Sequence, residues 1–153
     1  MSEDASSPPL IRPMRAEDVP AVCELIGQLT GYVPTEEAML DKLAWVECSA
    51  VDWVYVAEVD GVPCGFMGFR LREMLERPGR YGEISALVTD ARVRRHGVGR
   101  ALVAYAEDLA REHGCVGTWL VSGFGRKDEA HRFYDALGYA TTGYRFVKRF
   151  DED

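Results

Sequence analysis

RRHGVGRALVAYAEDLA, residues 94–110, is the stretch that decides how this chain folds. It joins a short, arginine-rich glycine loop to an amphipathic helix whose apolar stripe begins at Val98. The amino terminus of a helix carries N–H groups without intrahelical partners and the positive end of the helix dipole. Glycines at 97 and 99 let the backbone approach an anion without side-chain obstruction. The stretch therefore predicts a cradle for phosphate, and with it a phosphorylated cofactor.

Composition sets the broad class of the protein. The 153 residues are most simply one domain, and 47% hydrophobic with 28% charged residues is typical of a globular protein. The net charge of −7 argues against a general nucleic-acid binder, because neutralising phosphates requires a surplus of Lys and Arg. Cations are nevertheless concentrated at one place, where Arg92, Arg94, Arg95 and Arg100 lie close to His96. This cluster favours an anion site in the glycine loop.

The cysteines and the first residues indicate the compartment. Cys23, Cys48, Cys64 and Cys115 are widely spaced and lack a histidine at metal-ligand spacing, so we expect small buried thiols in a reducing cytoplasm and no metal. No apolar run approaches a membrane span, and the acidic, polar start differs from a signal peptide. We expect a cytoplasmic protein without membrane or nucleic-acid partners, with a disordered tail over residues 1–9 and a single domain over residues 10–150.

Periodicity and turn residues predict the order of the elements. The expected segments are a strand at 10–14, helices at 16–29 and 35–47, strands at 52–59, 62–71 and 81–89, the helix after the glycine loop, a strand at 115–122, a helix at 128–137 and a last strand at 141–150. The order β-α-α-β-β-β-α-β-α-β indicates an α/β fold. Its sheet is mixed and mostly antiparallel, with six to seven strands flanked by four helices.

Two common phosphate motifs do not fit the glycine loop. A Walker loop requires Gly-Lys-Ser/Thr after four spacer residues, and the chain has no such sequence here. A dinucleotide fingerprint requires a third glycine or alanine at position 102, where Leu102 stands, and glycines directly after the strand. The flanking sequence must therefore identify the cofactor.

Three blocks in this order resemble the GNAT superfamily of N-acetyltransferases. The first is Arg94-x-x-Gly97-x-Gly99, which is similar to the pyrophosphate loop of that family. The second is the preceding strand EISALVTD, residues 83–90, and the third is AHRFYDALGY, residues 130–139. The resemblance covers nearly the whole chain from residue 10 to residue 150.

The resemblance implies how acetyl-CoA would be held. The backbone N–H groups of the loop would bind its pyrophosphate, and the motif and these donors comprise Arg94, Arg95, His96, Gly97, Val98, Gly99 and Arg100. The pantetheine arm would pair like an added strand with the backbone of Leu87, Val88 and Thr89. The family places a β-bulge in this strand, and the N–H of Leu87 would point at the thioester oxygen.

Two residues are candidates for the catalytic chemistry. Acyl transfer requires a neutral amine, so a base must remove a proton, and Glu83 is the best candidate, directly or through water. By the period of two, Glu83 is expected to face the same way as Ser85, Leu87 and Thr89. Tyr134 matches the family tyrosine that donates a proton to the departing thiolate. The structural alternatives are a solvated glutamate at a strand end and a core tyrosine.

The resemblance implies an N-acetyltransferase that moves an acetyl group from acetyl-CoA to a primary amine of a small molecule, by direct attack in a ternary complex. The loops at residues 30–37 and 72–81 are expected to form an acidic, aromatic mouth for the amine, from Tyr32, Glu36, Glu37, Trp45, Glu73 and Glu76. A protein or peptide acetyltransferase, a non-catalytic acyl-CoA sensor and a nucleotide-binding regulator are the alternatives. A homodimer is also left open.

Overall fold

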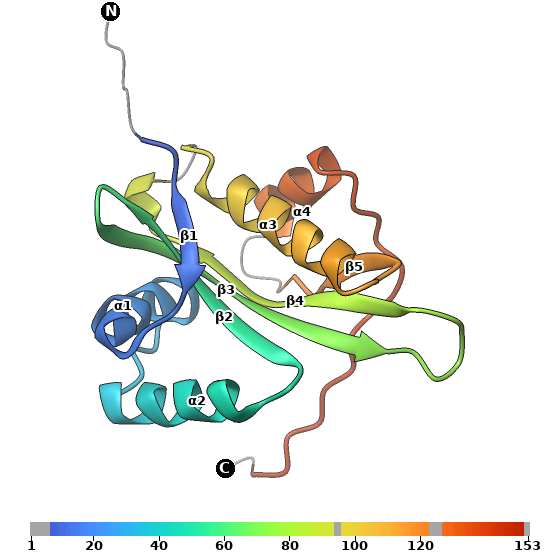
Figure 1. Ribbon diagram of the computed structural model, residues 1–153, viewed down its shortest axis with the longest axis horizontal. Helices are drawn as coiled ribbons and strands as arrows, with labels where there is room; N and C mark the ends of the chain where they lie inside the picture. The colour runs from blue at the N-terminus through green and yellow to red at the C-terminus, as the bar shows by residue number, and fades with distance from the viewer. Residues whose placement is uncertain (1–6, 94–95, 123–126, 152–153) are drawn as a thin grey trace, which may run out of the picture. The chain divides into compact units, whose positions relative to one another are not determined.

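The computed structural model describes residues 7–93, 96–122 and 127–151, and the chain divides into two compact units after Leu120. In the described part, the first unit holds a five-stranded sheet and three α-helices, and the second holds one helix (Figure 1). The elements are β1 (Leu10–Pro13), a 3-10 turn (Ala16–Asp18), α1 (Val19–Thr30), α2 (Glu36–Cys48), β2 (Asp52–Val59), β3 (Val62–Glu73), β4 (Arg80–Thr89), a second 3-10 turn (Ala91–Val93), α3 (Val98–Glu112), β5 (Gly117–Leu120) and α4 (Lys127–Ala136).

The strands lie in the order β1-β2-β3-β4-β5, antiparallel except for the parallel pair β4–β5. β2 has the predicted bounds, and its hairpin to β3 turns at Asp60 and Gly61, both with positive φ. The predicted amino terminus of α2 is confirmed, because the side chain of Thr35 accepts a hydrogen bond from the N–H of Ala38. Local sequence signals therefore account for these elements.

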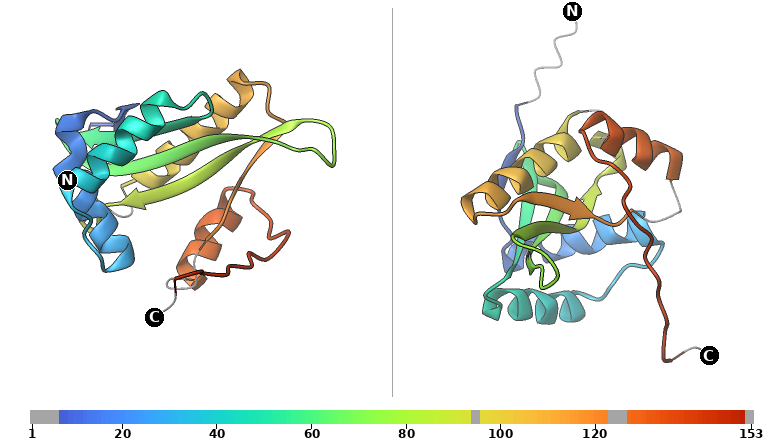
Figure 2. Two further views of the ribbon diagram at one scale, coloured as in Figure 1. Left: turned by 90° about the horizontal axis from the view of Figure 1, so that it is seen from below. Right: turned by 90° about the vertical axis from the view of Figure 1, so that its right-hand side faces the viewer.

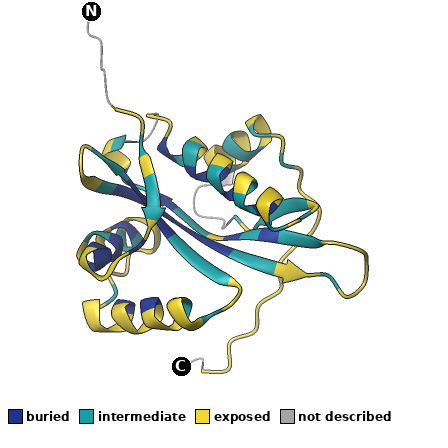
Figure 3. Cartoon of the chain, in the orientation of Figure 1, coloured by how far each residue is buried: buried dark blue, intermediate teal, exposed yellow. Residues whose placement is uncertain are grey.

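Helices cover both faces of this sheet: α1 and α2 lie on one and α3 on the other (Figures 1 and 2). Against α1 and α2 the sheet presents alternate residues of its strands, including Val54, Val56, Phe66 and Val88, and we call this the α1/α2 face. The intervening residues form the α3 face, where Tyr55 meets Tyr105 of α3 with ring centroids 4.9 Å apart. Figure 3 shows the buried positions concentrated in the middle of the sheet and on the inner sides of the helices.

Two glycines allow α3 to pack closely on the sheet. A Cβ on Gly82 would lie 2.6 Å from the ring of Phe69 and 3.0 Å from Ala110 of α3. A Cβ on Gly65 of β3 would lie 3.2 Å from Val98 and 3.3 Å from Leu102, both buried on α3. At these two points the apolar side of α3 packs against the backbone of the sheet, because glycine has no side chain.

The prediction of six to seven strands is wrong, because the sheet formed by the described residues has five. Residues 141–150, expected as the last strand, are described without strand structure. Their alternating apolar side chains stay exposed, with Phe146 at 94% and Phe150 at 93%. Alternation gives strand propensity, but a strand also needs a hydrogen-bonded neighbour, and residues 141–150 pair with none of the described strands.

Other expectations fall on the ends and the cysteines of the chain. Most of the predicted tail over residues 1–9 lies outside the described residues, and the single domain over residues 10–150 stays a prediction. Cys23 and Cys64 are buried as expected, whereas Cys48 is exposed. None of the helices in the described ranges is long and apolar enough to cross a membrane.

The close approach at Gly65 leads to a stability prediction. We expect Gly65→Ala to lower the free energy of unfolding by about 1–3 kcal/mol, because the added methyl group overpacks the contact with α3. Chemical denaturation followed by circular dichroism measures this loss. Gly143→Ala is the control, since a Cβ there meets nothing within 4 Å. Equal midpoints for the two variants would show that α3 does not depend on this contact.

Candidate functional site

An extra residue interrupts the regular pairing of β4. Gly68 of β3 pairs with Ala86 and the next residue, Phe69, pairs with Ile84, so Ser85 is left over as a β-bulge. The position opposite the bulge suits glycine, because a Cβ on Gly68 would overlap the hydroxyl oxygen of Ser85. The register shift lies two residues before Leu87, in the strand where the family resemblance implies a bulge.

The bulge changes which way the following side chains point. Paired residues on neighbouring strands project from the same face, and Leu87 pairs with Met67, next to Phe66 of the α1/α2 face. Leu87 and Thr89 therefore lie on the α3 face, whereas Glu83 lies on the α1/α2 face. The prediction that Glu83 shares its facing with Leu87 and Thr89 is wrong, because the period of two does not continue across the bulge.

The bulge also marks the end of the contact between β4 and β5. In the described part of the chain β5 pairs with Tyr81–Ile84 and with no later residue of β4. Ala86–Thr89 consequently have a strand neighbour on the β3 side alone. Their other edge presents backbone N–H and C=O groups that an extended ligand could pair with. This open edge contains Leu87, Val88 and Thr89, the residues predicted to pair with the cofactor.

The amino terminus of α3 provides a second set of backbone donors. Gly97 precedes the helix with φ of 80°, a conformation that glycine adopts without strain. The N–H of Ala101 donates to the Gly97 oxygen, so the N–H groups of residues 98–100 lie in the first turn, which has no intrahelical partners. The backbone of His96 is less suited to binding an anion than predicted, because its N–H already donates a hydrogen bond to the Val93 oxygen at 3.0 Å. Arg94 and Arg95, the remaining predicted residues of the loop, lie outside the described residues.

The open edge and the amino terminus of α3 are close together. Gly65 pairs with Thr89, the last residue of β4, and also approaches Val98, the first residue of α3. The donors of the helix therefore begin where the open edge of β4 ends. An extended ligand along the edge would bring an anionic end to the helix terminus.

A buried carboxylate fixes the turn between these two features. Asp90 is 4% exposed, and its side chain accepts hydrogen bonds from the Arg92 backbone N–H at 2.9 Å and from the Arg92 guanidinium at 2.7 Å. Gln28 of α1 accepts a hydrogen bond from the Ala91 N–H. The Arg92 hydrogen bonds outweigh burial and lower the pKa of Asp90 to about 2. Arg92, counted in the predicted anion-binding cluster, therefore has its charge directed at Asp90.

Glu83 stands among charged and aromatic neighbours on the α1/α2 face. Its carboxylate is 3.7 Å from the Arg72 guanidinium, and 19% of its side chain is exposed. The directly paired residues are Arg70 on β3 and Trp119 on β5. Sequence reasoning missed these neighbours because strand pairing, which brings Trp119 to Glu83 across 36 positions of the chain, is not visible in local patterns.

Tyr134 belongs to the second unit, where it lies on α4. Its ring centroid is 5.0 Å from that of Phe133 and 5.9 Å from that of Tyr139. Burial raises the pKa of the Tyr134 hydroxyl, which keeps it protonated at neutral pH. Gly138 ends this helix with φ of 89°, as its place in the motif predicts.

The predicted acidic mouth does not form. The loop after α1 and the loop between β3 and β4 lie at opposite ends of the sheet in Figures 1 and 2. Glu73 pairs instead with Arg80 across the hairpin, and Tyr32 is 70% exposed. The prediction assumed that the two loops lie close together. No sequence pattern specified their relative positions, and the assumption was wrong.

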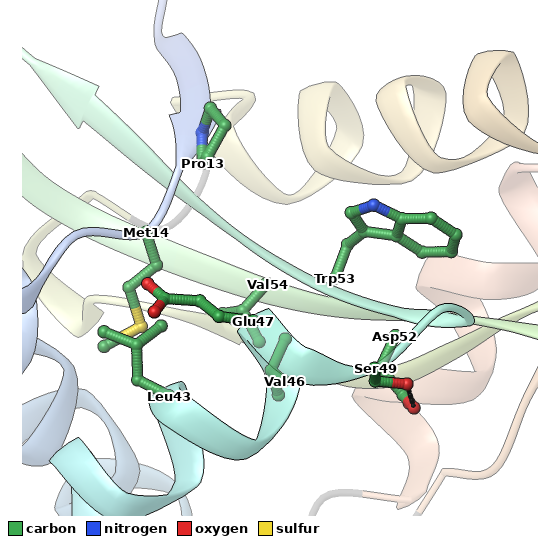
Figure 4. A pocket seen from close by; sticks show the side chains of 9 residues that line it. All are labelled: Pro13, Met14, Leu43, Val46, Glu47, Ser49, Asp52, Trp53 and Val54. Atoms are coloured by element: carbon green, nitrogen blue, oxygen red, sulfur yellow. Dashed lines mark hydrogen bonds between the residues drawn. The ribbon is translucent and has the colours of Figure 1, made fainter.

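A cavity of about 180 Å³ lies at a different place, between α2 and the first two strands (Figure 4). Leu43, Val46 and Trp53 line it together with the carboxylate of Glu47. None of its lining residues belongs to β4 or α3, so we do not assign it to the candidate site. Among the described residues, no group of three His, Cys, Asp or Glu side chains could hold a metal ion.

Comparisons with known proteins place the chain that carries the open β4 edge, the bulge and the helix terminus among acetyltransferases. The family model "Acetyltransferase (GNAT) family" matches residues 19–139. The uncharacterized N-acetyltransferase YhdJ of Bacillus subtilis is 45% identical over 136 residues, covering 87% of this chain and 89% of the relative. The aminoalkylphosphonate N-acetyltransferase of Salmonella typhimurium is 31% identical over 148 residues, covering 88% and 96%.

A solved structure extends the comparison to the fold. The aminoglycoside N-acetyltransferase AAC(6')-Iy in complex with CoA superposes with a TM-score of 0.80 at 19% identity, covering 97% of this chain and 98% of that one. The chain belongs to the GNAT family of acetyltransferases. The prediction that it is an enzyme of the N-acetyltransferase class is thereby confirmed.

The Asp90 contacts predict a pH-dependent stability. We expect Asp90→Asn to lower the free energy of unfolding by about 1–2 kcal/mol at pH 7, because charge-assisted hydrogen bonds of a buried carboxylate are lost. The lowered pKa means that this stabilisation is complete above about pH 4 and declines as the pH falls toward 2. Urea unfolding at several pH values measures the difference from the wild type.

Asp108→Asn is the control for this series, since Asp108 is exposed on α3. The difference between Asp90→Asn and the wild type should be constant between pH 7 and pH 5 and narrow at lower pH. A difference that stays constant down to pH 2 would contradict the role assigned to the Asp90 charge.

Proposed function

We propose that the protein transfers an acetyl group from acetyl-CoA to a primary amine of a small molecule, in a ternary complex. The observation that carries the proposal is the open edge of Ala86–Thr89 ending beside the amino terminus of α3. An extended pantetheine arm fits the edge and a pyrophosphate fits the helix terminus. The Salmonella relative, named for a small aminoalkylphosphonate, and the CoA complex of the structural neighbour support this choice.

Binding of acetyl-CoA would involve backbone groups more than side chains. The N–H groups of Val98, Gly99 and Arg100 would donate to the pyrophosphate, supported by the guanidinium of Arg100. Arg94, Arg95 and Gly97 complete the proposed loop. Backbone groups of Leu87, Val88 and Thr89 would pair with the pantetheine arm, and the Leu87 N–H would stabilise negative charge on the thioester oxygen.

The chemistry requires a neutral amine and a protonated leaving group. Acetyl-CoA supplies an activated acyl carbon; the amine nitrogen forms a bond to it while the carbon–sulfur bond breaks. Glu83 would take the proton that leaves the amine, directly or through water. Tyr134 would give its proton to the departing thiolate. Since Glu83 projects from the α1/α2 face, we infer that the amine approaches from that face.

Glu83→Gln and Tyr134→Phe test these roles. Each variant should lower kcat by about 10²- to 10⁴-fold, the usual loss for a general base or acid, while the Kd for acetyl-CoA stays near the wild-type value. CoA release with a panel of amines gives kcat, and isothermal titration gives Kd. Glu112→Gln and Tyr144→Phe are matched controls on exposed positions.

Full activity of both variants would contradict the catalytic assignment. Binding of acetyl-CoA without CoA release for any amine would instead favour the non-catalytic sensor. Faster release with peptides than with small amines would favour the protein acetyltransferase. The cytoplasmic location and the homodimer stay predictions.

A further inference from the structure

One row of side chains crosses four strands on the α1/α2 face. Asp52 of β2 pairs with Arg70 of β3, Arg70 pairs with Glu83 of β4, and Glu83 pairs with Trp119 of β5. Arg72 belongs to the neighbouring row of the same face, and its guanidinium lies 5.9 Å from the Trp119 ring centroid. Two arginines thus stand beside the proposed catalytic base.

These arginines are held loosely by their carboxylate neighbours. Arg70 is 3.5 Å from Asp52 and Arg72 is 3.7 Å from Glu83, both beyond the N–H···O hydrogen-bond length of about 2.7–3.2 Å. Asp52 accepts its short hydrogen bond from Ser49 instead, at 2.7 Å. By contrast, the guanidinium of Arg12 makes two 2.8 Å hydrogen bonds to Asp18. Arg70 and Arg72 also have 40% and 44% of their side chains exposed.

A structural role accounts poorly for this arrangement. Partly exposed ion pairs of such length contribute little to stability. Asp52 and Glu83 offset the charges of the two arginines in the free protein. In the proposed reaction, however, the ammonium group of the acceptor approaches Glu83, and Arg72 then loses its carboxylate neighbour. An acceptor that also carries an anion supplies a new partner for the arginine. The planar fork of an arginine matches the paired oxygens of a phosphoryl or carboxylate group.

We propose that Arg70 and Arg72 bind an anionic group of the acceptor, which is therefore a primary amine that also carries a phosphonate, phosphate or carboxylate. This proposal rests on the proposed acetyltransferase function. Neighbouring side chains on paired strands start about 5 Å apart, so about two or three carbon atoms would separate the amine from the anion. In this arrangement the carboxylate of Glu83 would face the ammonium group of the acceptor, and the arginines beside it would face the anionic group.

The same contacts suggest an exchange of partners at Glu83. Before the acceptor binds, the Arg72 guanidinium lies 3.7 Å from the Glu83 carboxylate. When Arg72 turns to the anionic group, the carboxylate faces the ammonium of the acceptor and takes its proton. The proton passes from nitrogen to a Glu83 oxygen, and no other bond changes in this step.

Three amines of nearly the same size test the proposal. They are 2-aminoethylphosphonate, β-alanine and propylamine, which differ in the group two carbons from the amine. We expect kcat/KM from CoA release to be about 10- to 100-fold higher for at least one anionic amine than for propylamine. The phosphonate and carboxylate arms distinguish which anion the site prefers.

Arginine variants identify the groups responsible. Arg70→Gln and Arg72→Gln should each lower kcat/KM for the preferred anionic amine about tenfold or more, and by a clearly larger factor than for propylamine. Arg111→Gln, on the exposed carboxyl end of α3, is the matched control. Isothermal titration of the same amines into the protein saturated with acetyl-CoA gives their Kd values independently of turnover.

The outcomes separate the two proposals. Equal kcat/KM for all three amines, or equal losses for charged and neutral amines in both arginine variants, would overturn the anion site and leave the acetyltransferase proposal intact. No CoA release from any amine would contradict the proposed function. In that case weak, equal Kd values for the three amines would overturn the anion site as well, whereas tighter, arginine-dependent binding of an anionic amine would support it.

Discussion

A single extra residue in β4, Ser85, is the constraint on which the candidate site depends. Its insertion opposite Gly68 shifts the register of β4 against β3 by one residue. Pairing with β5 stops one residue earlier, at Ile84. In the described part of the chain, β4 therefore has no second strand neighbour over Ala86–Thr89, and its edge is open there. Sheet edges are usually protected, and the proposed function assigns this one to the extended pantetheine arm.

The bulge also changes the face of the sheet from which the β4 side chains project. Before the bulge, Glu83 projects from the α1/α2 face, together with Arg70 and Arg72. After the bulge, Leu87 and Thr89 project toward α3. In the proposed function the acyl donor would lie along the edge and be held from the α3 side, while the acceptor would bind on the opposite face. Close packing at Gly65 and the Asp90 turn keep the terminus of α3 at the end of the edge.

Local sequence signals were enough for most of the fold. The alternation in Asp52–Val59, the Asp60-Gly61 turn and the Thr35 cap each specify an element through neighbours in the chain. The helix after the glycine loop could be placed for the same reason. Of the candidate site, the helix terminus was predictable from adjacent residues. The open edge of the strand before it was indicated by the family resemblance and by no local pattern.

Features that depend on distant pairing were not predictable. The family resemblance implied a bulge in this strand, but its position at Ser85 arises from the register with β3. The prediction that Glu83 shares the facing of Leu87 failed because the alternation was continued across that position. The alternation at residues 141–150 predicted a strand, but a partner strand is a tertiary property. Arg92 looked like part of an anion site because its buried partner, Asp90, could not be distinguished from an exposed aspartate. The row that contains Arg70 and Trp119 could not be predicted either, because it becomes visible only when the pairing of four strands is known.

Hydrogen–deuterium exchange with and without saturating acetyl-CoA tests the central claim most directly. We expect slower exchange at the amides of Leu87, Thr89 and residues 98–100, because these N–H groups of the open edge and the helix terminus would donate to the ligand. The amides of β1 and the exposed turn at Asp60 and Gly61 should exchange at unchanged rates. Unchanged exchange at both proposed segments, in protein shown by titration to be saturated, would contradict the account.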